Sequence, residues 1–191
     1  MSGLLVNLLR GASASGTNGA GGHSGIYYST PISSPSTTAP AADTLSVSPI
    51  LLSACSLDRI GVEVTAGAAN SLCRLGIYTD DKGYPGALLL DAGTVSGASI
   101  AVLEITIDQA IGGGLYWLAY KAEVGAPTVR ANAGVPGIFH FSATAAGVSA
   151  SGNARQGWLK AAQAAGSLPV AFPASPSETN GAVARVFVRG K

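Results

Sequence analysis

Residues 72–121 constrain the fold most, because apolar segments of strand length alternate there with short turn signals. Asp80, Gly83 and the Pro85-Gly86 pair favour turns, since Asp and Gly tolerate positive φ and proline fixes φ near the value that a turn needs. Three glycines at 112–114 precede the last segment. We expect strands at residues 72–78, 87–95, 100–107 and 115–121, with 88–95 and 100–107 forming a strand pair around a turn at 96–99.

Alternation of apolar and polar residues predicts further strands outside this stretch. In residues 57–65, Ile60, Val62 and Val64 fall on one face and small or charged residues on the other, the pattern of a half-buried antiparallel strand. Turn signals recur every ~8–12 residues, as in sandwiches and jelly rolls. Other strands are expected at residues 44–52, 128–131, 138–142 and 182–188. The sequence therefore predicts an all-β fold: an antiparallel, jelly-roll-like β-sandwich with an extended N-terminal arm.

Two segments do not follow the strand pattern. Residues 29–42 are rich in Ser, Thr and Pro, which predicts extended chain that crosses a surface. Residues 154–165 are expected to form a short helix, with Asn153 as its N-cap and Gly166 just past its end.

The N-terminal residues have a different composition from the rest. Leu4, Leu5, Leu8 and Leu9 would share one face of a helix that is too short to be stable alone in water. Residues 11–25 hold six Gly, three Ser and three Ala, the composition of a flexible tether. The leucines fit either a frayed terminus or a segment that docks on a partner, and the tether favours docking. We therefore divide the chain into an anchor and tether at 1–25 and a β-sandwich domain at 26–191.

The small share of charged residues bears on the partners of the chain. Charged residues make up 11%, against about 25% in a typical soluble domain, which predicts that partner chains cover part of the surface. We expect a homo-oligomer, with a trimer favoured. The net charge is +1 and the basic residues are scattered, which argues against nucleic-acid binding. The longest apolar run is far shorter than the ~20 residues of a membrane span, so we expect no membrane association.

The first ten residues and the two cysteines bear on the cellular compartment. The start of the chain lacks a basic region, and Asn7 interrupts its apolar stretch, so we do not expect a signal peptide. Cys55 and Cys73 could form a disulfide if neighbouring strands bring them together, or could remain reduced thiols within a core. Alternation within residues 72–78 places Cys73 on the side of the core.

The residues that carry catalysis or hold metals are sparse. His23 lies in the tether and His140 in an expected strand, and the sequence has no Cys/His cluster with metal-ligand spacing. Asp80 and Asp81 could join Asp91 around calcium, but the Asp-x-Asp-x-Asp-Gly loop is missing, so we interpret them as turn formers. The isolated acids Glu63, Glu104 and Asp108 identify no glycosidase pair. The sequence also lacks a Gly-x-Ser-x-Gly elbow and a phosphate-binding loop. We expect a non-enzymatic protein without cofactor or metal.

Aromatic side chains offer a possible binding surface. Exposed Tyr and Trp rings serve as flat platforms for sugars and for protein partners. Tyr78, Tyr84, Tyr116, Trp117 and Tyr120 are concentrated around one expected hairpin. One face of residues 115–120 must nevertheless belong to the core, so some of these aromatic side chains are structural. The residues that we expect to contact a receptor are Asp80, Asp81, Tyr84, Tyr116 and Tyr120.

Several motifs resemble a recurring pattern in the structural proteins of bacteriophages and prophages. RLGIY at 74–78, Pro-Gly at 85–86, LDAGTV at 90–95 and GLYWLA at 114–119 occur in the same order as in that family. The segments at 48–50, 58–62 and 168–173 are also similar, so that the resemblance covers roughly residues 26–188. It implies a β-sandwich domain on a virion appendage: a tail fibre, a baseplate or tail-tip component, or a capsid decoration.

The resulting hypothesis is a virion structural protein of a tailed phage, assembled in the host cytoplasm. A tail-fibre or tail-tip role with contact to a host surface glycan or protein is favoured. The leucines at positions 4, 5, 8 and 9 would dock on other virion proteins. The alternatives are a capsid decoration or cement protein and a free carbohydrate-binding module. A hydrolase would need a clustered acid and base, which the sequence does not identify.

Overall fold

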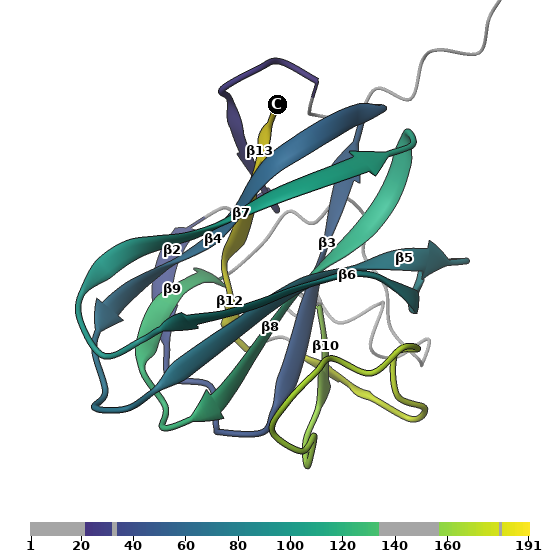
Figure 1. Cartoon of the computed structure of the whole chain (residues 1–191). Helices are drawn as coiled ribbons and strands as arrows, with labels where there is room; N and C mark the ends of the chain where they lie inside the picture. The colour runs from purple at the N-terminus through teal and green to yellow at the C-terminus, as the bar shows by residue number, and fades with distance from the viewer. Residues whose placement is uncertain (1–21, 32–33, 134–156, 180) are drawn as a thin grey trace, which may run out of the picture.

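The structure is a computed structural model that describes residues 22–31, 34–133, 157–179 and 181–191. Every regular element in this part of the chain is a β-strand, and the strands form two antiparallel sheets packed face to face (Figure 1). The described residues thus contain no helix that could cross a membrane. The predicted all-β, antiparallel sandwich is confirmed.

Within the described residues, sheet A has six strands and sheet B has seven, all paired antiparallel. The spatial order in sheet A is β11 (Ser177–Thr179), β10 (Gly157–Lys160), β3 (Leu45–Leu52), β8 (Gly114–Val124), β5 (Leu72–Asp81) and β6 (Tyr84–Ser96). The order in sheet B is β1 (Tyr27–Ser29), β13 (Val186–Gly190), β4 (Cys55–Ala66), β9 (Thr128–Ala133) and β12 (Val183–Ala184). In addition, β2 (Ser34–Thr38) pairs with β9, and β7 (Ala101–Ile111) pairs with β4.

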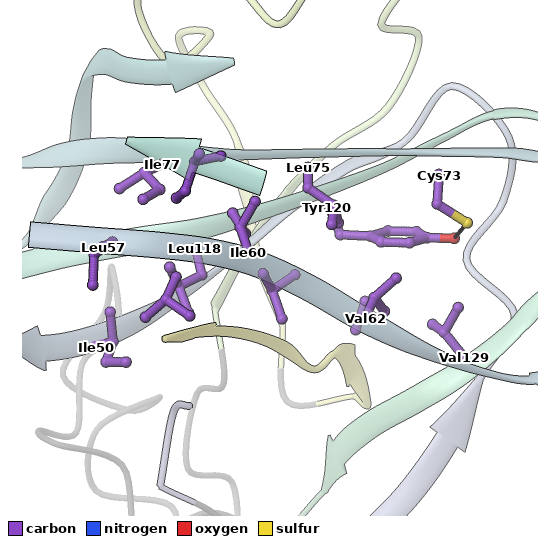
Figure 2. Packing of buried hydrophobic residues seen from close by; sticks show 14 of the residues in the cluster. Ile50, Leu57, Ile60, Val62, Cys73, Leu75, Ile77, Leu118, Tyr120 and Val129 are labelled. Carbon is purple, nitrogen blue, oxygen red and sulfur yellow. Dashed lines mark hydrogen bonds between the residues drawn. The ribbon is translucent and has the colours of Figure 1, made fainter. Parts of the chain in front are cut away.

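The main core fills the space between the two sheets (Figure 2). Alternate residues of β4, among them Ile60 and Val62, point to this side and meet Leu75 of β5 and Leu118 of β8. Each fully buried side chain of this size contributes about 1.5–3 kcal/mol through removal of apolar surface from water. Cys73 also points inward, as its alternation predicts, and both cysteines are free thiols.

Two turn signals are predicted within residues 79–86. The first, Asp80–Gly83, contains a two-residue hairpin loop between β5 and β6, whereas the second, Pro85-Gly86, lies within strand β6 and is wrong as a turn. Lys82 and Gly83 both have positive φ, 56° and 89°. This conformation matches the right-handed twist of paired strands. The carboxylate of Asp80 accepts the Gly83 amide at 2.9 Å and fixes the loop.

The expected strand pair 88–95 and 100–107 is wrong. β6 pairs with β5 in sheet A, whereas β7 pairs with β4 in sheet B, and residues 97–100 cross between the sheets. The amide of Gly97 donates to the Ser71 carbonyl, and its carbonyl accepts the Ala68 amide, so the connection is docked on a neighbouring turn. The crossing lets the apolar sides of β6 and β7 contribute to one core from opposite sheets.

The helix expected at 154–165 is also wrong over its described part. Residues 157–160 are β10, which pairs with β3, and the chain that follows is irregular. Gly157 lies against the Val47 carbonyl, where an added Cβ would come within 1.9 Å of oxygen, and Trp158 is buried. Close packing on the sheet therefore outweighs the helical pattern.

Residues 29–42 contain one strand within the extended crossing that the sequence predicts. This strand, β2, lies at an edge of sheet B, where Pro35 is tolerated because one side of the strand needs no donor. The strand expected at 138–142, with His140, lies outside the described residues.

The core makes a direct prediction. Ile60→Ala should lower the free energy of unfolding by about 2–5 kcal/mol, because it leaves a cavity between the sheets. Ile100→Ala removes the same atoms from a side chain that is 74% exposed and should change stability by less than about 0.5 kcal/mol. Urea unfolding monitored by tryptophan fluorescence measures both, and equal losses would contradict this assignment of the core.

Candidate functional site

The predicted contact residues at the β5–β6 hairpin lie together at one end of sheet A. The Tyr84 ring, which is 41% exposed, packs on Trp158 with the ring centroids 4.2 Å apart. Asp81 is exposed, whereas the Asp80 carboxylate accepts Trp117 Nε1–H at 2.9 Å besides the Gly83 amide. The hairpin thus presents Asp81 and Tyr84, while Asp80 maintains its shape.

The other two tyrosines lie elsewhere. Tyr120 is fully buried in the main core, with its hydroxyl 3.4 Å from Cys73 Sγ, and burial raises its pKa. Tyr116 packs against the same core and donates its hydroxyl to the Gly112 carbonyl. The structure therefore separates Tyr116 and Tyr120 from the hairpin surface. Leu4, Leu5, Leu8 and Leu9 lie outside the described residues.

The outer face of sheet A carries a second buried cluster. Trp117 and Tyr78 alternate outward from the main core and are covered by Leu168 and Phe172. The rings of Tyr78 and Phe172 meet edge to face at 5.5 Å, and the Tyr78 hydroxyl donates to the Pro169 carbonyl at 2.9 Å. We call residues 161–172 the covering segment, because they lie on this face against β5, β6 and β8.

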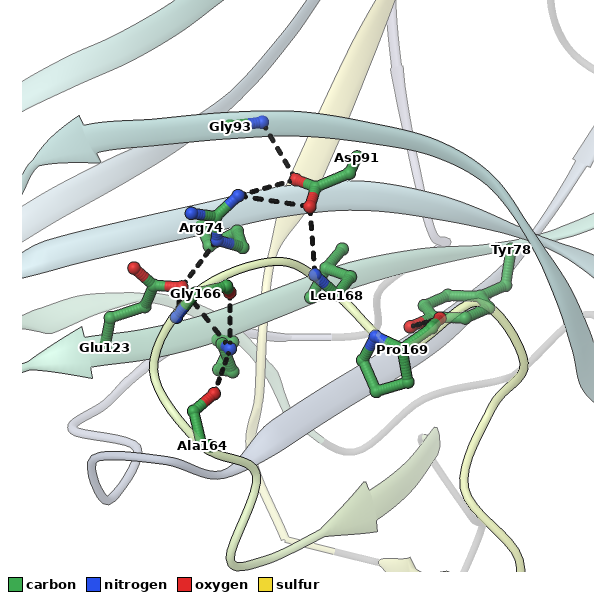
Figure 3. A network of polar contacts seen from close by, with 10 residues as sticks. Arg74, Tyr78, Asp91, Gly93, Glu123, Ala164, Gly166, Leu168 and Pro169 are labelled. Atoms are coloured by element: carbon green, nitrogen blue, oxygen red, sulfur yellow. Dashed lines mark hydrogen bonds and ion pairs between the residues drawn. The ribbon is translucent and has the colours of Figure 1, made fainter.

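A network of charged residues holds the covering segment on the sheet (Figure 3). Arg74 donates to the carboxylates of Asp91, at 2.9 Å, and of Glu123. Asp91 also accepts the Leu168 amide at 2.9 Å, and Glu123 accepts the Gly166 amide at 3.0 Å. The network joins three strands of sheet A to one irregular segment.

Lys121 completes this network from a fully buried position. Its Nζ donates to the carbonyls of Ala164 and Gly166, both at 2.8 Å, and lies 3.3 Å from Glu123. Because each charge has its partners, the arrangement fixes the backbone of the covering segment.

The pKa values of the two carboxylates are shifted in the direction that such partners produce. Burial tends to raise the pKa of Asp91, but hydrogen bonds from the amides of Leu168 and Gly93 and from Arg74 outweigh it, so the pKa is lowered. Burial likewise opposes the shift at Glu123, where Arg74 has the largest lowering effect on the pKa. Both groups therefore remain charged in the folded protein at neutral pH.

Among the residues that the structure describes, no segment covers the outer face of sheet B at a groove of about 650 Å³. Cross-strand register places Glu104, Gly61 and Phe187 side by side on β7, β4 and β13, and places Val102 next to Glu63. The Phe187 ring lies over Gly61, where an added Cβ would be 2.5 Å from the ring. The missing side chain thus leaves room for the Phe187 ring, which lines the groove.

Tyr27 bounds the groove on the side of β1. Its ring, 47% exposed, meets Phe187 edge to face at 5.6 Å, and the Arg189 guanidinium lies 5.6 Å from its centroid. A hydrogen bond between the Tyr27 hydroxyl and the Glu104 carboxylate raises the pKa of the tyrosine. Tyr27 therefore reaches across the sheet from β1 toward β7.

Charged side chains line another part of the groove. Arg130 donates to both oxygens of Glu63, at 2.7 and 2.9 Å, and Arg185 lies in the same wall. Sequence reasoning did not find this site. The outward alternation of Glu63 was readable, but nothing local indicated that Tyr27 and Phe187, far apart in the chain, would join it.

Among the residues that the structure describes, no group of three or more His, Cys, Asp or Glu could hold a metal ion. Comparison of the chain with protein-family models and with curated proteins found no match.

The network on sheet A predicts a dependence of stability on acid. In the folded protein the pKa values of Asp91 and Glu123 lie below their unfolded values, which are about 3.9 for Asp and 4.3 for Glu. The stabilisation by these two carboxylates is therefore complete at a pH above the unfolded pKa values. It is lost as the pH falls through the lower folded pKa values. Asp91→Asn should lower stability at pH 7 and flatten its decline below about pH 4.

Urea unfolding of wild type and variant from pH 7 to pH 2.5 measures this effect. Hydrogen bonds from Arg189 and Arg130 also lower the pKa values of Asp58 and Glu63, so these carboxylates contribute to the loss of stability in acid as well. The effect of Asp91 is therefore the difference between the wild-type and the variant profiles. Asp81→Asn at the exposed hairpin is the matched control and should keep the wild-type profile. Parallel profiles for Asp91→Asn and wild type would contradict the role of Asp91.

Proposed function

We propose that this chain is a non-enzymatic structural protein of a tailed-phage virion, a tail-fibre or tail-tip component that contacts the host surface. One observation carries the proposal. The motifs that resemble phage structural proteins, dispersed over residues 74–173, form one connected unit in the fold.

The contacts within this unit join motif to motif. Arg74 of RLGIY pairs with Asp91 of LDAGTV. Gly76 lies so close to Leu168 of the last motif that an added Cβ would be 2.3 Å from its Cδ1. Tyr78 contacts Phe172. Residues in mutual contact have to be compatible with each other, so a shared set of motifs fits a shared architecture better than a chance match of short segments.

The surface supports assembly into a larger particle. Ile26, Ile100, Val102 and Val170 are large apolar side chains, each at least half exposed. β7 pairs with β4 along one edge, and within the described residues no strand pairs with its other edge. An open edge of this length is a template for pairing with another chain. Both features fit a homo-oligomer, for which we propose a trimer.

The place of the protein in a particle tests the proposal. Particles purified from cells that carry the gene should contain the chain, and gold-labelled antibodies against it should mark the tail tip or fibres in electron micrographs. Label on the head would favour the capsid-decoration alternative. Absence of the chain from purified particles, with the chain present in the lysate, would contradict a virion role.

The anchor predicted at the N-terminus gives a second test. The Gly25 amide donates to the Gly190 carbonyl, and the His23 carbonyl lies beside Gly190, so a deletion that spares the sandwich should end at residue 21. The protein that lacks residues 1–21 should keep the wild-type unfolding midpoint but no longer enter particles. A variant with Leu4, Leu5, Leu8 and Leu9 changed to Ser should behave in the same way. Wild-type incorporation of both variants would exclude anchoring by this segment.

A further inference from the structure

We infer that the groove on the outer face of sheet B binds a neutral sugar residue of a glycan. The inference rests on the proposed receptor-contacting function and names the ligand class and the site. It places the site on the opposite sheet from the hairpin of Asp81 and Tyr84. Shape, aromatic surface and balance of charge each contribute to it.

The shape of the groove suits a small ligand. Its volume of about 650 Å³ falls within the range of about 300–1,000 Å³ that small-molecule sites occupy. The floor is rigid, because β4 and β13 are paired along both of their edges. Gly61 leaves the space that the Phe187 ring occupies.

The aromatic residues provide the apolar part of a sugar site. The C–H groups on one face of a pyranose ring pack on exposed aromatic surface, while its hydroxyls stay at the rim. Tyr27 and Phe187 offer such surface from neighbouring strands, in an edge-to-face pair that holds both rings. Val102, 63% exposed on β7, extends the apolar surface.

The charged residues provide donors and acceptors without net charge. Two carboxylates, Glu63 and Glu104, balance two guanidiniums, Arg130 and Arg185, in the lining. The pair of Glu63 and Arg130 uses two of the five N–H donors of the arginine and leaves further acceptor positions on the carboxylate. Of two neighbouring sugar hydroxyls, one can donate to the Glu63 carboxylate while the other accepts from the Arg130 guanidinium.

The same features argue against other ligand classes. A phosphate or a polyanion would meet two carboxylates in the lining, whose negative charges repel an anion. An extended peptide that adds to a sheet needs a free strand edge. The floor strands β4 and β13 offer none, because both of their edges are engaged, so a peptide could add only at the bordering strands β1 or β7. A neutral polyhydroxylated ligand can pack on the aromatic rings and form hydrogen bonds with the charged side chains at the same time.

The experiment uses the purified full-length chain on a printed array of neutral and acidic oligosaccharides, including fragments of bacterial surface polysaccharides. The strongest neutral ligand is then titrated by calorimetry. We expect binding to at least one neutral oligosaccharide. Tyr27→Ala should weaken it at least tenfold through loss of the platform, and Glu63→Gln several-fold. Val170→Ala removes a side chain that is 84% exposed in the covering segment on the other sheet, and should leave the affinity unchanged.

Three results would overturn the inference: no binding to neutral oligosaccharides, binding to acidic ones only, or equal affinity of Tyr27→Ala and wild type. Thermal unfolding of each variant shows whether the fold is retained. If Tyr27→Ala is unstable, Tyr27→Phe serves in its place. It keeps the ring and loses the hydroxyl that meets Glu104, and should weaken binding less than Glu63→Gln does. The array result does not depend on location in a particle, so failure of this inference is distinguishable from failure of the virion role.

Discussion

The ammonium group of Lys121 is fully buried on the outer face of β8, where Glu123 and the carbonyls of Ala164 and Gly166 surround it. Removing one partner of a buried charge pair typically costs about 3–5 kcal/mol, because the other charge is left uncompensated. The covering segment therefore has to stay on the sheet. While it stays, it keeps Trp117 and Tyr78 out of water, and the Asp80 carboxylate bound to Trp117 keeps the β5–β6 hairpin in place. One network of charges thus stabilises an apolar cluster that the two-sheet core alone would leave exposed.

The two sheets consequently differ in what they offer to solvent. Sheet A is buried on both faces, by the main core and by the covering segment, and presents mainly its hairpin end. The outer face of sheet B, as far as the described part of the chain shows, carries aromatic, aliphatic and charged side chains in one groove. Binding surfaces on β-sandwiches need a rigid floor, which sheet B provides through strands paired on both edges. This division fits a protein that is fixed in an assembly and displays one face.

The small share of charged residues and the exposed apolar side chains also support the proposed assembly with other chains. Ile100 and Val102 flank the start of β7, whose outer edge is open within the described residues, so this side of the sandwich is suited to contact with another chain. The groove lies on the adjoining face, where Val102 belongs to its wall. In an oligomer built through β7, ligand sites would therefore lie close to the subunit boundaries.

The sequence by itself determined the fold class, most strand positions and the hairpin at Lys82-Gly83, because these depend on local alternation and on backbone preferences of a few residues. Only the tertiary structure decided that β6 and β7 belong to different sheets, since a short connection is compatible with a hairpin or with a crossing. It also decided that residues 157–160 extend along β3 rather than coil, because close contact between Gly157 and Val47 outweighs a weak helical pattern. The groove arises in the same way: Tyr27, Glu63, Glu104 and Phe187 meet through register between strands distant in the chain. Alternation tells which face a residue occupies, but the long-range pairing of strands sets its neighbours, and that pairing depends on the packing of the whole core.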